Sequence, residues 1–200
     1  MASRNWAVLP PHGRRQRIGL FGGSFNPVHE GHVLVAETAL RRLQLDWLWW
    51  LVTPGNPLKE TGDLADIEAR ERAVMQVAAH PRMVVTDIEA DLGTRYTADT
   101  LRVLMARAPQ ARFVWVMGAD GLTHFHRWDR WSDIAARMPI AVVDRPGETF
   151  RAVASPAAHR MAKDRVDESD ANLLANMAKP AWTFLHGPRN PISSTALRAL

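Results

Sequence analysis

Short apolar runs alternate with longer segments of helical periodicity along most of the chain. The apolar runs are nearly continuous and end at glycine, proline or aspartate, which is typical of strands buried on both faces. The predicted strands are residues 18–21, 47–52, 83–87, 113–117, 140–143 and 182–185. The longer segments space their hydrophobic residues three or four apart, which predicts helices. These helices are expected at 31–43, 67–79 and 97–107, and residues 148–176 are also expected to be helical.

The alternation of strand and helix predicts an α/β fold, in which a parallel sheet carries helices on both faces. A chain of 200 residues has the length of one domain. We therefore expect a single domain with a Rossmann-like, doubly wound parallel sheet at residues 17–200, after a flexible leader at 1–16. In such sheets ligands bind beyond the carboxyl ends of the strands, where the glycine-bearing loops are collected.

Composition narrows the function classes. With 46% hydrophobic and 23% charged residues, the chain is neither collagen-like nor fully disordered. The absence of cysteine excludes disulfide scaffolds, cysteine zinc sites and thiol nucleophiles. Three of the 25 basic residues are lysine, which leaves 22 arginines and favours anionic ligands. No apolar run has the length of a signal peptide or a membrane span, so we expect a cytoplasmic protein that does not contact a membrane.

The loop after the first predicted strand, residues 22–32, has the sequence GGSFNPVHEGH. Two glycines let the backbone approach a ligand, and the loop leads into a helix whose free N–H groups favour phosphate. His29 and His32 are three residues apart and can face the same way. A tight strand-to-helix turn with a capping histidine is the alternative interpretation.

Other phosphate and metal motifs do not fit this loop. The glycine-rich loop that ends in Gly-Lys-Ser/Thr is absent, and so is G-x-G-x-x-G. The run His29-Glu30-Gly31-His32 is one residue shorter than H-E-x-x-H and contains a glycine, which disfavours a helical zinc site.

The loop resembles G-G-[ST]-F-x-P-x-H-x-G-H, a signature of the H-x-G-H nucleotidyltransferase superfamily. The second signature, I-S-S-T-x-[IV]-R, matches residues 192–198, with leucine at the penultimate position. Within the superfamily the chain is similar to bacterial nicotinate-nucleotide adenylyltransferases. The supporting segments are residues 53–59, 96–101, 118–122 and 125–128.

This resemblance implies the transfer of an adenylyl group from ATP to nicotinate mononucleotide, which gives nicotinate adenine dinucleotide and pyrophosphate in NAD biosynthesis. The mononucleotide's phosphate attacks the α-phosphorus directly, so neither a covalent intermediate nor a strong base is needed. Positioning and fixed hydrogen-bond donors then supply the catalysis. The pyrophosphate leaving group implies Mg²⁺, which the nucleotide phosphates can hold.

By the same resemblance, His29 and His32 are the catalytic pair that stabilises the transition state. The implied ATP-binding residues are Gly22, Gly23, Ser24, Lys59, Ser194, Thr195 and Arg198. The serine and threonine of the second motif also suit a helix cap. Leu58 departs from the histidine that is common in the family, which weakens a phosphate role for the loop around Lys59. Because the chain stops two residues after Arg198, the last helix is expected to be brief.

For the mononucleotide, the resemblance implies Thr97 at the nicotinate carboxylate, Trp128 stacked on the pyridine ring and Asp120 near the ribose. Thr97 could instead only cap a helix. Trp131 is expected in the core. His124 and His126 are expected to be surface residues.

Several alternatives stay open at this point. A phosphopantetheine adenylyltransferase usually has threonine at the position of His29, and a cytidylyltransferase lacks the middle segments. A nucleic-acid-binding protein needs a basic stripe with stacking aromatics, whereas the arginines are spread along the chain. An inactive member of the superfamily is disfavoured because the motif residues that its phosphate chemistry needs are all present. The sequence does not choose between the acid and the amide mononucleotide.

Overall fold

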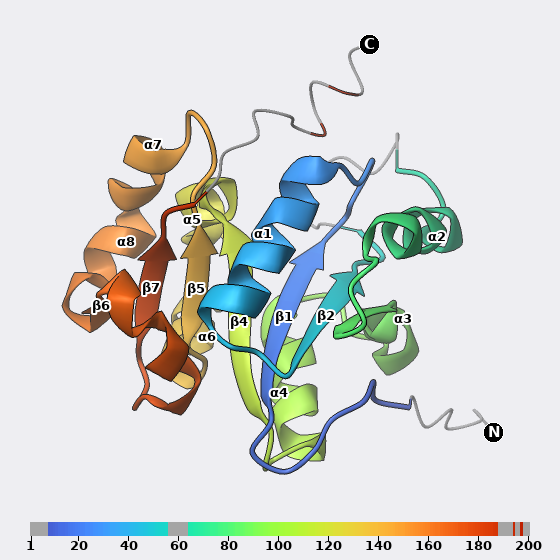
Figure 1. The fold of residues 1–200 in the computed structure, drawn as a ribbon, viewed down its shortest axis with the longest axis horizontal. Coiled ribbons are helices and arrows are strands. Elements are labelled where there is room, and N and C mark those ends of the chain that lie inside the picture. The colour runs from blue at the N-terminus through green and yellow to red at the C-terminus, as the bar shows by residue number, and fades with distance from the viewer. Residues whose placement is uncertain (1–7, 56–63, 188–193, 195–196, 198–200) are drawn as a thin grey trace.

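The computed structural model describes residues 8–55, 64–187, 194 and 197. Its centre is a sheet of seven strands in the order β3-β2-β1-β4-β5-β7-β6, and every described pair is parallel. The strands are β1 Arg17–Gly23, β2 Trp47–Val52, β3 Met83–Thr86, β4 Arg112–Gly118, β5 Ile140–Val143, β6 Arg165–Val166 and β7 Trp182–Leu185. The predicted α/β fold with a doubly wound parallel sheet is confirmed (Figure 1).

Helices pack on both faces of the sheet (Figure 1). One face carries α1 Glu30–Arg42, α2 Ile67–Val77 and the 3-10 helix η2 Glu168–Asn176. The opposite face carries α3 Ile88–Leu92, α4 Thr97–Arg107, α5 Ala119–Phe125, α6 Trp131–Arg137, α7 Thr149–Val153 and α8 Pro156–Arg160. A short 3-10 helix, η1 Ala162–Asp164, leads into β6. None of the described helices is long and apolar enough to cross a membrane.

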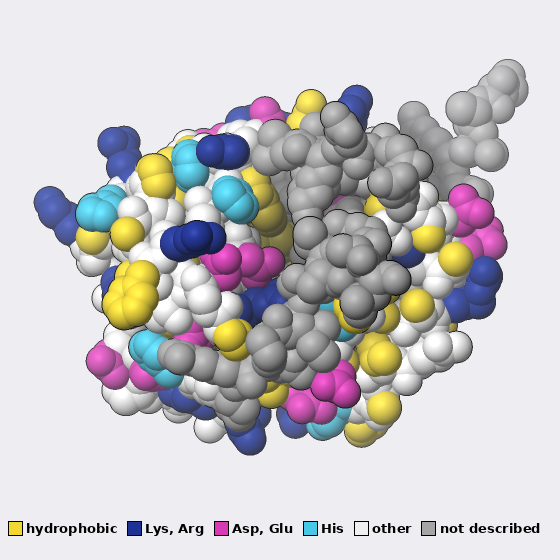
Figure 2. All heavy atoms as spheres, turned by 90° about the horizontal axis from the view of Figure 1, so that it is seen from above, with side chains coloured by type: hydrophobic (Ala, Val, Ile, Leu, Met, Phe, Trp, Pro, Cys, Tyr) yellow, Lys and Arg dark blue, Asp and Glu magenta, His cyan; other side chains and the backbone are white. Residues whose placement is uncertain are grey.

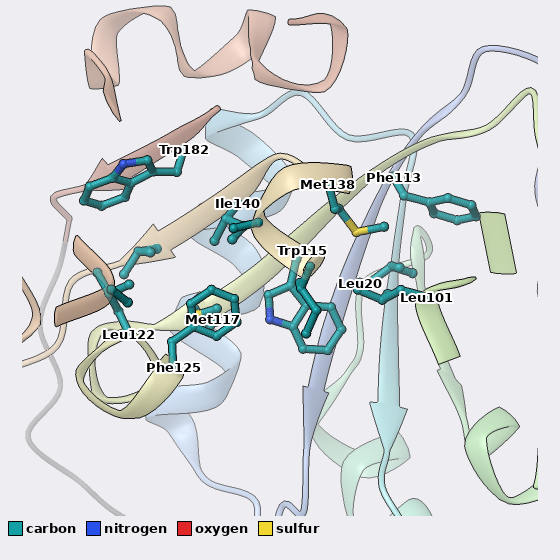
Figure 3. Packing of buried hydrophobic residues seen from close by; sticks show 14 of the residues in the cluster. Leu20, Leu101, Phe113, Trp115, Met117, Leu122, Phe125, Met138, Ile140 and Trp182 are labelled. Atoms are coloured by element: carbon teal, nitrogen blue, oxygen red, sulfur yellow. The ribbon is translucent and has the colours of Figure 1, made fainter. Parts of the chain in front are cut away.

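The strands divide their side chains between two hydrophobic clusters. Because neighbouring side chains in a strand point to opposite faces, Trp49 belongs to the cluster on the face of α3 to α8, while Trp50 belongs to the cluster on the face of α1, α2 and η2. In β4, Trp115 and Val116 divide in the same way. Figure 3 shows the first of these clusters, in which Trp115, Met117 and Phe125 lie between the sheet and its helices. This burial on both faces is why the strands read as unbroken apolar runs.

The predicted long elements match the structure, but several short ones were not predicted. The helix predicted at 31–43 lies at Glu30–Arg42, and the strand predicted at 113–117 lies at Arg112–Gly118. The sequence analysis missed α3, α5, α6 and β6, which have between two and seven residues. Elements of that length complete too few turns or alternations to produce a periodic pattern.

Residues 8–16 precede β1 and belong to the predicted leader. Pro10 is buried, the ring of His12 meets Trp49 edge-on at 6.3 Å between ring centroids, and the Arg15 N–H donates to the carbonyl of Gln110 at 2.7 Å. Residues 1–7 lie outside the described part of the chain. The contacts show that this half of the leader lies against the domain.

The carboxyl ends of the parallel strands meet at one edge of the sheet, the upper edge in Figure 1. Backbone hydrogen bonds continue past the strands there. The N–H of Thr53 donates to Gly23 at 3.0 Å, and that of Asp144 donates to Leu185 at 2.9 Å. Helix α1 begins at the same edge, directly after the loop that follows β1. We call this edge the rim.

A buried carboxyl group supports the segment between α3 and α4. Glu89 is only 5% exposed, and its Oε1 accepts a hydrogen bond from Thr100 Oγ1 at 3.0 Å. The hydroxyl of Thr94 lies 2.8 Å from that of Thr100, and the Thr94 N–H donates to the Glu89 carbonyl at 3.0 Å. Burial raises the pKa of Glu89 to about 7, and the bond from Thr100 opposes part of the rise.

This raised pKa predicts that the domain loses stability as the pH rises. From pH 4.5 to about 7 the unfolded chain releases the Glu89 proton while the folded chain keeps it, so the free energy of unfolding falls over that window and then levels. The loss is about 3 kcal/mol, and Glu89→Gln should remove it. Urea unfolding at pH 5 and pH 8 measures both proteins.

A matched control is Glu37→Gln, which alters an exposed carboxyl group on α1 and should leave the difference between the two pH values unchanged. If wild type and Glu89→Gln lose stability in parallel between these pH values, the raised pKa of Glu89 is wrong.

Candidate active site at the rim

The loop after β1 is shaped by close packing beneath its glycines. A Cβ atom on Gly22 would lie 2.6 Å from Trp115 Cη2, and one on Gly23 would lie 2.9 Å from Phe25 Cε1. The ring of Trp115 is buried and cannot move aside, so larger residues do not fit at position 22. The two glycines at the end of β1 therefore allow the main chain to pack closely against these rings.

The buried side chain of Arg70 holds this loop in place, a role that was not predicted from the sequence. Its side chain is 3% exposed, and it donates to the carbonyl oxygens of Ser24, Thr53 and Ala65 at 2.7–2.8 Å. Burial lowers its pKa, and Asp66 opposes the shift. The arginine thus joins the loops after β1 and β2. In the sequence it occupies a helical position among charged residues, where nothing distinguishes it from a solvated side chain.

The two histidines of the loop lie at the first turn of α1. Their ring centroids are 3.9 Å apart, and the His29 N–H donates to Nδ1 of His32 at 3.3 Å. His29 is 6% exposed, and neither of its ring nitrogens has a hydrogen-bond partner among the described residues. His29 is the N-cap residue of α1, and the hydrogen bond that caps this turn is the one that Nδ1 of His32 accepts from the His29 N–H. An unpartnered buried imidazole at a helix N-terminus indicates a ligand site.

Arg145 and Asp120 complete this corner of the rim. Asp120 lies in the first turn of α5, Arg145 follows β5, and its Nη1 lies 3.5 Å from Asp120 Oδ1. A Cβ atom on Gly31 would lie 3.2 Å from Arg145 Nη2, which places the guanidinium beside the start of α1. The pKa of His29 falls to about 4 because of burial and the charge of Arg145, while Asp120 opposes the shift.

No role in the site was predicted for Arg145 from the sequence. Its position directly after a strand of the parallel sheet was the available signal, because carboxyl ends of strands gather at ligands. Seen from above the rim in Figure 2, arginine, carboxylate and histidine side chains gather there. The helix N-terminus, the histidine pair and Arg145 together present N–H donors and positive charge, an arrangement that suits an anion, and we call this part of the rim the phosphate corner.

The residues predicted to contact the mononucleotide lie on α4, on α5 and in the segment before α6. Thr97 is the first residue of α4, and Trp128 lies between α5 and α6. The indole of Trp128 meets the rings of Trp115 and Phe125 edge-on, with centroids 5.9 and 5.4 Å apart. Packing against these two rings holds the indole of Trp128 in place, while part of its side chain stays exposed. Trp131 packs against the core, as expected.

The two signature motifs meet in space. Ser194 Oγ donates to the carbonyl of Pro27 at 2.9 Å, which brings this residue of the second motif to the loop that carries the histidines. Among the other predicted ATP-binding residues, Lys59, Thr195 and Arg198 lie outside the described residues. No group of three or more His, Cys, Asp or Glu side chains that could hold a metal ion occurs in the described part of the chain.

Comparison with known proteins identifies the class. A model of the cytidylyltransferase-like family matches residues 20–200, and the chain belongs to this family of nucleotidyltransferases. A probable nicotinate-nucleotide adenylyltransferase of Rhizobium meliloti is 59% identical over 182 residues, which cover 91% of this chain and 97% of the relative. One from Mesorhizobium japonicum is 55% identical over 191 residues, 95% of this chain and 98% of the relative. Within the class, the chain therefore belongs to the nicotinate-nucleotide adenylyltransferases.

Solved structures show the same fold. Nicotinic acid mononucleotide adenylyltransferase from Plasmodium falciparum, complexed with NaAD, has a TM-score of 0.69 at 17% identity. The match covers 92% of this chain and 83% of the other. The predicted family and fold are thus confirmed.

The charges in the phosphate corner predict how substitutions of Arg145 and Asp120 shift the pH at which the His29 ring titrates. In the free protein its ring should titrate near pH 4. Arg145→Gln removes a nearby positive charge and should raise that midpoint, whereas Asp120→Asn removes a negative charge and should lower it. The ¹H and ¹³C shifts of the His29 ring, followed by NMR against pH, give all three midpoints. Equal midpoints in the three proteins would remove Arg145 and Asp120 from contact with His29.

Proposed function

We propose that the protein joins ATP to nicotinate mononucleotide and releases pyrophosphate and nicotinate adenine dinucleotide, a step of NAD biosynthesis. The relatives that are 55–59% identical bear the name of this activity. The observation in the structure that carries the proposal is the unpartnered pair of ring nitrogens on His29, buried at the N-terminus of α1 beside Arg145. This arrangement suits the phosphates of a nucleotide.

In this proposal the ATP phosphates occupy the phosphate corner. The backbone of Gly22, Gly23 and Ser24 is proposed to lie beneath the phosphates, with the first N–H groups of α1 directed toward them. Ser194 reaches the same loop through its bond to Pro27. Thr195, Arg198 and Lys59 are proposed as further phosphate contacts on the resemblance alone.

The reaction forms a bond between an oxygen of the mononucleotide phosphate and the α-phosphorus of ATP. The bond from that phosphorus to the pyrophosphate oxygen breaks, and the electron pair leaves with pyrophosphate. Because the attacking phosphate is already anionic, no residue has to remove a proton. The main barrier is the approach of two negatively charged groups, which fixed donors at the site lower.

The two histidines and Arg145 have different parts in lowering that barrier. At neutral pH His29 is uncharged, since its pKa is about 4 in the free protein, so it donates one N–H to a phosphate oxygen. His32 lies beside it at the helix start and donates in the same way. The guanidinium of Arg145 supplies a positive charge beside the start of α1.

Mg²⁺ fits this site as part of the ATP complex. The described residues offer Asp120 as the carboxylate beside the phosphate corner, and no cluster of three ligands. We therefore propose that the phosphates and water hold the ion, whose chemistry is to offset the charge on the leaving pyrophosphate.

The mononucleotide is proposed to lie across α4 and the segment before α6. The indole face of Trp128 stacks on the electron-poor pyridine ring, and the first turn of α4 at Thr97 offers a hydroxyl and free N–H groups to the carboxylate. Asp120, in the first turn of α5, is proposed to contact the ribose. We also propose a cytoplasmic location, because the proposed substrate ATP is found inside the cell.

The proposal predicts release of pyrophosphate when the purified protein receives ATP, Mg²⁺ and nicotinate mononucleotide. A coupled pyrophosphate assay measures the rate, with nicotinamide mononucleotide and phosphopantetheine as alternative acceptors. His32→Ala should lower kcat by about 10²-fold or more, because a donor to the transition state is lost. Activity with phosphopantetheine alone would refute the proposal.

A further inference from the structure

An ion pair joins the two elements that carry the proposed mononucleotide pocket. Asp99, in the first turn of α4, accepts two hydrogen bonds from Arg130, at 3.0 Å from Nη1 to Oδ1 and at 2.7 Å from Nη2 to Oδ2. This parallel pair of bonds fixes both position and orientation, unlike a single contact. The bonds from Arg130 hold the pKa of the Asp99 carboxyl below its usual range.

The pair lies close in sequence to both proposed contacts. Asp99 is two residues after Thr97, and Arg130 is two residues after Trp128. Thr97 lies in α4 and Trp128 lies in the segment before α6. The two residues of the ion pair, Asp99 and Arg130, are 31 residues apart in the sequence. The pair therefore fixes the start of α4 relative to the segment that bears Trp128.

The backbone of Arg130 supports a specific role for this residue. Its φ is 49°, in the left-handed region, which is unfavourable for a residue that carries a Cβ atom. Its guanidinium also donates from Nε to Asp129. The segment thus adopts a costly conformation in which the arginine fork meets Asp99, and the contacts of the fork oppose that cost.

The opposite side of the same turn of α4 has its own anchor. The hydroxyl of Thr100 donates to buried Glu89, and the carbonyl of Tyr96 accepts from the N–H of Thr100 at 3.2 Å. The first turn of α4 is consequently held from the core by Glu89 and from the surface by Arg130. The second anchor reaches the segment that bears Trp128.

We propose that Asp99 and Arg130 are positioning residues for the pyridine nucleotide, which keep the first turn of α4 at the distance from Trp128 that the ring and its carboxylate require. This proposal rests on the proposed function, because it takes Thr97 and Trp128 as the mononucleotide contacts. Neither Asp99 nor Arg130 needs to touch the substrate.

The test compares Asp99→Asn, Arg130→Gln and the double variant in the pyrophosphate assay. Each single change should raise KM for nicotinate mononucleotide by roughly 5- to 20-fold and leave KM for ATP within about twofold, because only one substrate's pocket is loosened. The double variant should resemble the single ones, since either change already breaks the pair. Asp99→Glu, which keeps the carboxylate, should recover most of the affinity.

Arg102→Gln is the matched control. Arg102 also lies 3.7 Å from Asp99, but on the same helix, so its loss removes a charge without separating the two elements. Its KM values should equal those of wild type. Arg130→Gly, which suits the left-handed backbone, provides a second folded variant without the pair, and it should match Arg130→Gln.

Trp128→Ala separates failure of this inference from failure of the proposed function. If Trp128→Ala leaves KM for the mononucleotide unchanged, the pocket itself is misplaced. If Trp128→Ala raises it while Asp99→Asn and Arg130→Gln do not, the positioning role is refuted. A loss confined to Arg130 variants, seen with the acid but not the amide mononucleotide, would also overturn the proposal in favour of direct contact with the carboxylate.

Discussion

Parallel pairing of the strands is the constraint on which the rest of this structure depends. All described strand pairs run in the same direction, so every strand ends at one rim, and each connection must cross back over a face before the next strand begins. Helix α1 therefore starts at the rim, with its free N–H groups beside the loop after β1. The site for an anion follows from the way the sheet is connected, and the histidines refine it.

The rim is held rigid by groups that lie beneath it. Arg70 ties three loop carbonyls together, Trp115 fills the space below Gly22 and supports Trp128, and Glu89 anchors α4. A reaction that depends on aligning two anionic substrates gains from such support, because the catalytic donors then need no rearrangement as the bond forms. The same residue, Trp115, lies under both halves of the site and so couples their positions.

The fold and the loop that carries the two histidines could be predicted from the sequence because their signals are local. The strands are apolar runs, and the histidines stand in one contiguous motif at residues 22–32. Arg70, Arg145 and the pair Asp99–Arg130 were missed because each acts across loops or elements distant in sequence. The chain has 22 arginines and three lysines, so being an arginine could not by itself distinguish Arg70, Arg145 or Arg130 from the others.

The most direct test of the central claim is the titration of His29 in the presence of ATP. If the ATP phosphates bind at the N-terminus of α1, their negative charge must favour the protonated ring, so the NMR midpoint should rise from about 4 by one unit or more with saturating Mg-ATP. Nicotinate mononucleotide alone, bound further along the rim, should move it less. A midpoint that stays the same while ATP is bound would contradict the account.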